Sequence, residues 1–216
     1  MDPFRACLAI LPLAVYLLVI GFINLSRRPF MTTGGRDRYA LGLALAGLFA
    51  VGPMELFMPL GAAGLFGGYV WLLLFAFYFL LVTFLVLIAR PRIVVYNITV
   101  EELRPIVARL VNELDGEHRW AGNSVMLPKL GIQLQIERFA ATRNVALAAN
   151  ATDQSFAGWR QLERRLAAAL AETETAANPL GVFFVSTSSL LFAAAAFLLA
   201  RFPEAALRGL QSWLQV

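Results

Sequence analysis

A single carboxylate, Glu55, stands within a long apolar segment, in the stretch GPMELFMP (residues 52–59). An ionisable residue in a membrane segment is by default a candidate for moving protons or ions. Such a relay would need a second charge, and the other apolar segments carry none. If a helix begins at Tyr39, Glu55 lies about 24 Å along it. In a hydrocarbon core of about 30 Å, this position predicts an interfacial carboxylate near the outer edge.

The stretch TTGGRDR (residues 32–38) offers hydroxyls, glycines and arginines, which could together bind a phosphate group. No strand precedes it, so it does not match a Walker or dinucleotide-binding loop. Asp37 is expected to pair locally or to cap the following helix, where a carboxylate is favoured. The alternative role of the loop is contact with anionic lipid headgroups. We expect that role for Arg27, Arg28, Arg36 and Arg38.

The remaining reactive side chains do not form a pattern that predicts catalysis. The chain has a single cysteine, Cys7, and a single histidine, His118. These counts exclude an internal disulfide and a zinc cage of cysteines or histidines. The sequence also lacks a nucleophile elbow, a carboxylate dyad and metal-ligand spacing. We therefore expect no catalytic residue, no cofactor and no metal site.

The composition predicts a membrane protein. Of the 216 residues, 59% are hydrophobic and 15% charged, against about 25% charged in soluble domains. Crossing a hydrocarbon core takes about 20 helical residues. Four segments are long and apolar enough, and the first is expected to be retained, since no signal-peptide cleavage site follows it. The expected spans are residues 6–25, 39–58, 65–89 and 179–200.

The polar segment between the third and fourth spans predicts a small α+β domain over residues 91–178. It contains ten basic and ten acidic residues, and this neutral balance argues against nucleic-acid binding. Its patterns predict the order β-α-β-β-β-α, with Thr99 and Glu102 forming a capping box and two helices on one face of the sheet. The basic run WRQLERR (residues 159–165) is expected to be a solvated helix face.

The expected organisation is therefore three membrane helices in residues 1–90, the α+β domain in 91–178, and a fourth span with a terminal helix in 179–216. Small residues repeat along two of the spans, and such faces let membrane helices approach closely. We expect these faces to pack within one chain, or between chains in a homo-oligomer. They comprise Gly42, Ala46 and Ala50 in the second span, and Ser186, Ser189, Ala193, Ala196 and Ala200 in the fourth.

The arginines of the first loop predict the orientation, because short loops rich in basic residues stay in the cytoplasm. Both termini are then outside and residues 91–178 are cytoplasmic. In residues 202–216, polar residues recur every three or four positions, as expected for one face of a helix. They predict a helix that lies flat in the outer interface with Trp213 at headgroup level, its polar face formed by Glu204, Arg208, Gln211 and Gln215.

Three stretches resemble uncharacterised membrane proteins of planctomycete-type bacteria: RPFMTTGGRD (28–37), GPMELF (52–57) and RIVVYNITVEELRP (92–105). The resemblance implies a bacterial inner-membrane location and no known activity. The leading hypothesis is a non-enzymatic membrane protein whose cytoplasmic α+β domain binds a protein partner or a soluble ligand. The alternatives are a transporter or channel component, with a path along the second and fourth spans, and a membrane enzyme acting on a lipid-linked substrate.

Overall fold

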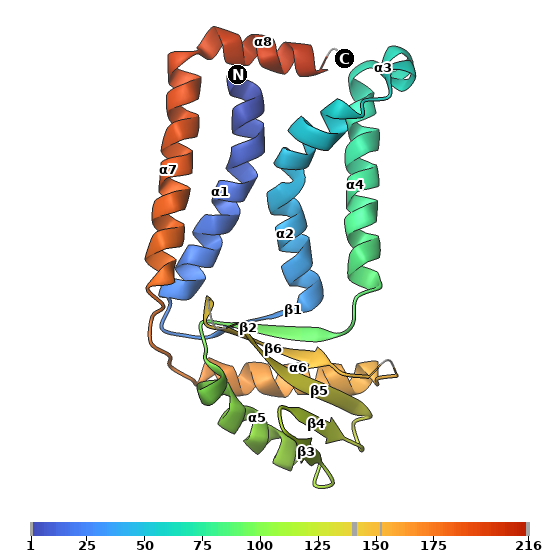
Figure 1. Cartoon of the computed structure of the whole chain (residues 1–216), viewed down its shortest axis with the longest axis vertical. Coiled ribbons are helices and arrows are strands. Elements are labelled where there is room, and N and C mark those ends of the chain that lie inside the picture. Colours follow the sequence, from blue (N-terminus) through green and yellow to red (C-terminus); the bar gives the residue numbers. More distant parts are fainter. Residues whose placement is uncertain (1, 140–141, 152, 215–216) are drawn as a thin grey trace. The chain divides into compact units, whose positions relative to one another are not determined.

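The computed structural model describes residues 2–139, 142–151 and 153–214 (Figure 1). The chain divides into two compact units. We call them the helical unit, which comprises the described residues of 1–21, 38–87 and 182–216, and the sheet unit, which comprises those of 22–37 and 88–181. The sheet unit therefore includes the first loop as well as the segment expected to form the α+β domain.

Three of the described helices are long and apolar enough to cross a membrane. They are Pro3–Leu25, Gly64–Leu87 and Leu180–Arg201, with 23, 24 and 22 residues. The elements that form these candidate spans and their connections are α1 (Pro3–Leu25), α2 (Gly34–Phe49), the π-helix η1 (Ala50–Met54), α3 (Leu60–Phe66), the 3-10 helix η2 (Gly67–Tyr69), α4 (Val70–Leu87), α7 (Leu180–Arg201) and α8 (Pro203–Leu214).

The expected span over residues 39–58 differs from the other three. The α-helix α2 ends at Phe49 and continues as η1, a π-helical turn that contains Pro53. Proline has no backbone N–H to donate and clashes with the preceding turn, and a wider π-helical turn accommodates it. The helical path from Gly34 to Leu56 is nevertheless unbroken.

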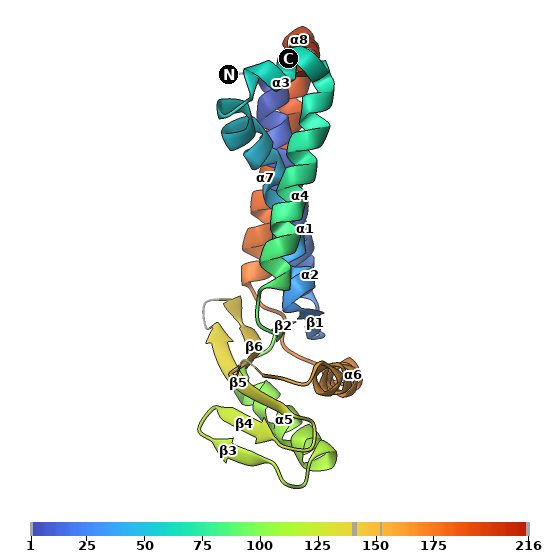
Figure 2. The same cartoon turned by 90° about the vertical axis from the view of Figure 1, so that its right-hand side faces the viewer.

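The long helices of the helical unit stand side by side in the order α7, α1, α2, α4 (Figures 1 and 2). The Ser188 hydroxyl of α7 donates a hydrogen bond to the carbonyl of Ala14 in α1, at 2.8 Å. Between α2 and α4, the Tyr78 hydroxyl donates to the carbonyl of Gly42, at 2.7 Å. At the crossing of α1 and α2, a Cβ added to Gly47 would lie 1.9 Å from the carbonyl oxygen of Leu8.

The small-residue face predicted for the fourth span is not the face through which α7 packs on α1. All five of its residues are exposed, whereas Gly181, Ser188 and Ala195 are buried at intervals of seven. The residues of both rows are small enough for close approach of another helix. The row that faces α1 is the one with Gly181, Ser188 and Ala195, because Ser188 donates a hydrogen bond to α1. The exposed row consists of Ser186, Ser189, Ala193, Ala196 and Ala200.

The small residues of α2 pack on α4 rather than on α7. A Cβ on Gly42 would lie 2.9 Å from a methyl group of Val82 in α4. Ala50 is fully buried and belongs to a cluster that includes Trp71 and Tyr78, with Ala46 packed against it. The predicted close approach at α2 is therefore present, with a different partner helix.

The sheet unit contains a six-stranded antiparallel sheet in the order β1-β2-β6-β5-β4-β3. It has two strands more than the four expected. The first loop supplies one, and the stretch around Gly122, whose φ is +64°, folds into a hairpin of two strands. The strands are β1 (Phe30–Thr33), β2 (Arg92–Tyr96), β3 (Arg119–Ala121), β4 (Ser124–Leu127), β5 (Ile132–Phe139) and β6 (Asn144–Ala149).

Two amphipathic helices, α5 (Val100–Leu114) and α6 (Phe156–Ala171), pack on one face of this sheet and enclose the hydrophobic core. The predicted capping box of Thr99 and Glu102 is present at the start of α5. A backbone hydrogen bond there lowers the pKa of the Glu101 carboxyl, burial partly opposes this, and Arg138 at 3.7 Å lowers it further. Fully buried members of the core include Leu103, Val107, Val125, Leu134, Leu147, Leu162 and Leu166.

A network of buried asparagines joins the sheet to the chain segments that leave α1 and enter α7. Asn178 donates from its side chain to Asn24 Oδ1 at 2.9 Å and to the carbonyl of Thr142 at 3.2 Å. Its own Oδ1 accepts from the Leu180 N–H, which caps α7. Asn97 is fully buried in the left-handed region, at φ +58°, and donates to the carbonyl of Ser26 at 2.6 Å.

Candidate binding surface

The two faces of the sheet differ in what they present. Along β5, Ile132, Leu134 and Ile136 point into the core beneath α5 and α6, and the alternate residues point to the opposite side. Cross-strand pairing places polar and apolar side chains of three strands on that opposite side. We call this surface the open sheet face; it consists of Arg92, Met126, Gln133, Gln135, Glu137 and Phe139.

The strand register explains how the centre of the open sheet face forms. Ala148 of β6 lies between Arg92 and Gln135, and Ala146 is paired with Glu137. Because both β6 residues are small, the long side chain of Arg92 can reach across β6 to β5. Its Nη2 lies 3.7 Å from Glu137 Oε2, and its guanidinium carbon lies 4.9 Å from the centre of the Phe139 ring.

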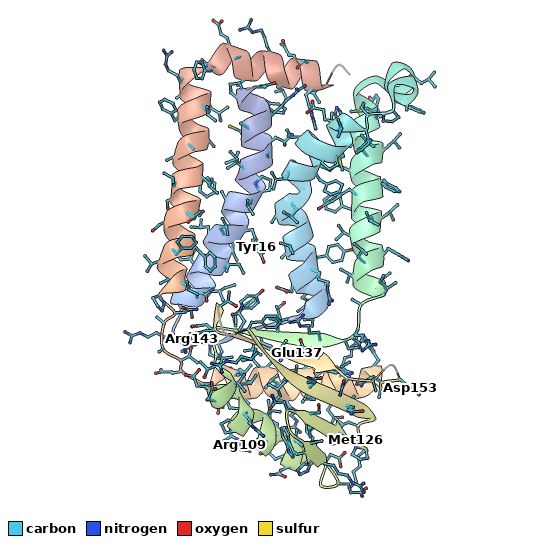
Figure 3. The ribbon with its side chains drawn as sticks, viewed as in Figure 1. Tyr16, Arg109, Met126, Glu137, Arg143 and Asp153 are labelled. Carbon is cyan, nitrogen blue, oxygen red and sulfur yellow. The ribbon has the colours of Figure 1, made fainter. Side chains whose placement is uncertain are left out.

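The outer parts of the open sheet face are apolar and accessible. Met126 is 48% exposed and Phe139 is 43% exposed. Methionine side chains adapt to irregular partner surfaces, and methionine, aromatic and arginine residues are enriched in protein interfaces. Chemically, this combination suits the binding of another polypeptide. Figure 3 labels Met126 and Glu137 on the sheet, and Arg109 on α5.

The first-loop arginines lie on both sides of a strand, β1, and this corrects the expectation that no strand precedes the glycines of the loop. Arg27 and Arg28 are exposed in the bend before β1, and Arg36 and Arg38 lie in the first turns of α2. Between them, residues 30–33 pair with β2. Asp37 accepts a hydrogen bond from the Tyr96 hydroxyl, which ties the start of α2 to the sheet.

Glu55 has a charged partner that the sequence reasoning missed. Its Oε1 lies 2.6 Å from Nη2 of Arg5. Arg5 precedes the expected first span, residues 6–25, but α1 begins earlier, at Pro3. The expectation that the other spans hold no charge for Glu55 is therefore corrected. Both side chains remain partly accessible, so the pair bridges α1 and the end of η1 at an accessible edge of the helical unit.

Trp213 faces the protein. It is 8% exposed and stacks on Trp71 with ring centres 3.9 Å apart. The Trp71 indole N–H donates to the carbonyl of Trp213 at 2.6 Å. Close approach of α8 is possible at Gly68, where a Cβ would lie 2.4 Å from the Leu214 carbonyl oxygen. The large apolar side chains that the described part of α8 leaves exposed are Leu207 and Leu214. Gln215, expected on its polar face, lies outside the described residues.

Comparisons of the chain with protein-family models, with curated proteins and with solved structures found no match.

The open sheet face is not evident from the sequence. The alternation in IQLQIERF (residues 132–139) predicts a strand with one polar side. It does not indicate which strands lie beside it, and Arg92 is separated from Glu137 by more than forty positions. Their meeting depends on the insertion of β6 between β5 and β2.

Proposed function

We propose that this chain is a non-enzymatic protein of a bacterial inner membrane that binds a protein partner through the open sheet face of its cytoplasmic unit. The observation that carries the proposal is the asymmetry of the sheet. One face is covered by α5 and α6. The other presents exposed Met126 and Phe139 and the partly accessible Arg92–Glu137 pair, while Val94 and Ala146 on the same side are buried.

The chemistry of this face supports a polypeptide as the ligand. Two exposed apolar side chains supply area that favours burial, since each square ångström of apolar surface removed from water contributes about 25 cal/mol. Arg92 and Glu137 supply one positive and one negative group, and charged groups of this kind fix the register in which a partner binds. Gln135 adds an amide donor and acceptor at the centre, and Gln133 adds the same groups beside Met126.

Photo-crosslinking in the native host tests this proposal. A photoreactive amino acid is placed at Met126 or at Phe139, and as a matched control at Arg109, which is exposed on α5. We expect one discrete adduct of the same mass from both sheet positions and none from Arg109. Replacing Gln135 with arginine should abolish that adduct, because it places a bulky charge at the centre of the surface, where Gln135 pairs with Ala148.

Absence of an adduct from both sheet positions would contradict the proposal. So would the same set of adducts from Arg109, because it would indicate non-specific collisions.

We further propose that α2 together with η1 is a fourth crossing, so that both chain termini are outside. The path from Gly34 to Leu56 is about 34 Å long at the α-helical rise. Contacts in the helical unit support alternating directions. The start of α1 meets the end of α7 through Cys7 and Ala195, and the end of α2 meets the start of α1 at Gly47. The start of α2 meets the end of α4 at Gly42.

A reporter inserted after Asn150, an exposed residue that follows β6, tests the orientation. We expect a cytoplasmic reporter to be active there and alkaline phosphatase to be inactive, because the first-loop arginines keep their side of the membrane in the cytoplasm. An alkaline phosphatase fusion at the amino terminus is the control and should be active. Active phosphatase after Asn150 would reverse the proposed orientation.

A further inference from the structure

The helix α6 has a basic outer face that its packing leaves accessible. Its inner side, with Trp159, Leu162, Leu166 and Leu170, belongs to the core. On the outer side, a shallow groove is lined by six exposed residues of the helix, the five named next and Ala157. We call this surface the α6 basic face; it consists of Phe156, Arg160, Gln161, Arg164 and Arg165.

The arginines of this face form no close ion pair in the described part of the chain. Among the described residues, the ion pairs within 4.0 Å do not involve Arg160, Arg164 or Arg165. The Arg160 guanidinium lies 5.1 Å from the centre of the Phe156 ring, and that ring is 69% exposed. The face therefore offers three available guanidinium groups and one accessible aromatic side chain.

Chain connections keep the last residue of α6 close to the point where α1 ends. Ala171, the last residue of α6, is four residues from Thr175, a separation of at most about 14 Å in an extended chain. The Thr175 N–H donates to the carbonyl of Arg27 at 2.9 Å, and Arg27 follows the last residue of α1, Leu25, by two positions. Asn178 forms hydrogen bonds with Asn24, which lies in α1.

The strand β1 also links α6 to the ends of the long helices. The helix contacts β1, and β1 runs from Phe30, five residues after the end of α1, to Thr33, directly before α2. β1, which contacts α6, is thus connected through the chain to α1 at one end and to α2 at the other. Polar headgroups extend beyond the hydrocarbon core of a bilayer, and electrostatic attraction extends about 8–10 Å further at ordinary salt.

We propose that the α6 basic face binds the anionic headgroups of the adjacent membrane leaflet and holds the sheet unit against the bilayer. Guanidinium groups bind phosphate oxygens with two parallel hydrogen bonds, and a basic amphipathic helix is typical of a membrane surface. Phe156 supplies the apolar contact at the boundary of the headgroups. This role replaces the solvated helix face expected from the sequence, and it is independent of the partner proposed for the open sheet face.

A fluorescent label on α6 in the full-length protein tests the proposal. Cys7 is replaced with alanine, and Ala168, exposed one turn after Arg164, is replaced with cysteine and labelled with an environment-sensitive dye. The protein is placed in nanodiscs of phosphatidylcholine alone or with phosphatidylglycerol. We expect quenching by shallow lipid-attached nitroxides to be several-fold stronger in the anionic discs, and to return to the level of the neutral discs at about 1 M salt, where the screening length falls to about 3 Å.

The control label is placed at Arg109→Cys, on the exposed side of α5, and its quenching should not depend on lipid charge. Changing Arg160, Arg164 and Arg165 to glutamine should remove the difference between discs, whereas changing them to lysine should retain most of it. If the glutamine variant fails to fold, the salt dependence of the parent protein still decides. Equal quenching in both kinds of disc, or a salt-insensitive signal, would overturn the proposal.

Discussion

Replacing Asn178 with alanine is expected to destabilise the sheet unit by about 2–4 kcal/mol. The side chain is 2% exposed and makes three hydrogen bonds, to Asn24, Thr142 and Leu180. Losing the cap of α7 costs about 0.5–2 kcal/mol. Leaving buried partners with fewer hydrogen bonds costs about 1–3 kcal/mol more, because alanine cannot replace the donors.

The measurement is thermal unfolding of the purified protein in mild detergent, followed by near-ultraviolet circular dichroism. Asn150→Ala is the matched control, because Asn150 is exposed and its backbone bond to Gln133 is kept. We expect a midpoint several degrees lower for Asn178→Ala and almost no change for Asn150→Ala. Equal midpoints for the two variants would show that the buried network does not stabilise the fold.

Replacing Gly47 with alanine is expected to separate α1 from α2 and to destabilise the helical unit by more than about 1–3 kcal/mol, the usual cost of overpacking. The new Cβ would lie 1.9 Å from the carbonyl oxygen of Leu8 and 3.0 Å from its carbonyl carbon. Both atoms belong to the backbone, so no side-chain rotation relieves the clash. In an open helix position the same change would be favourable by about 1 kcal/mol.

Gly52 provides a control, because alanine at this position is not expected to destabilise the protein. A Cβ there would meet no atom within 4 Å, and the residue lies in the helical segment that continues from α2. We expect Gly52→Ala to leave the melting temperature in detergent unchanged or slightly raised, and Gly47→Ala to lower it strongly. A stable Gly47→Ala protein would mean that α1 and α2 do not cross in close contact at this position.

Local features of this protein could be predicted from its sequence because they depend on neighbouring residues. Runs of about twenty apolar residues predict candidate spans, and three of them are helices of membrane-spanning length. The spacing of Thr99 and Glu102 predicts a capping box, which is formed. The apolar rows of α5 and α6 predict the core side of both helices correctly, since helical periodicity repeats every few residues.

Contacts between distant segments were decided by the tertiary structure alone. Residues 30–33 form an edge strand only because β2 pairs with them. The choice between two small rows of α7 depends on the Ser188 bond to α1. Glu55 gains its partner because the first turn of α1 meets the end of η1, and Trp213 becomes buried because α8 folds onto Trp71.

The open sheet face illustrates the physical reason for this division. The sequence of β5 determines that its residues alternate between two sides. Which strands pair depends on the relative free energies of many possible pairings between segments far apart along the chain. A local sequence pattern therefore does not predict the pairing. Only the folded order β2-β6-β5 brings Arg92 across two alanines to Glu137 and Phe139, and with it the surface that we propose binds a partner.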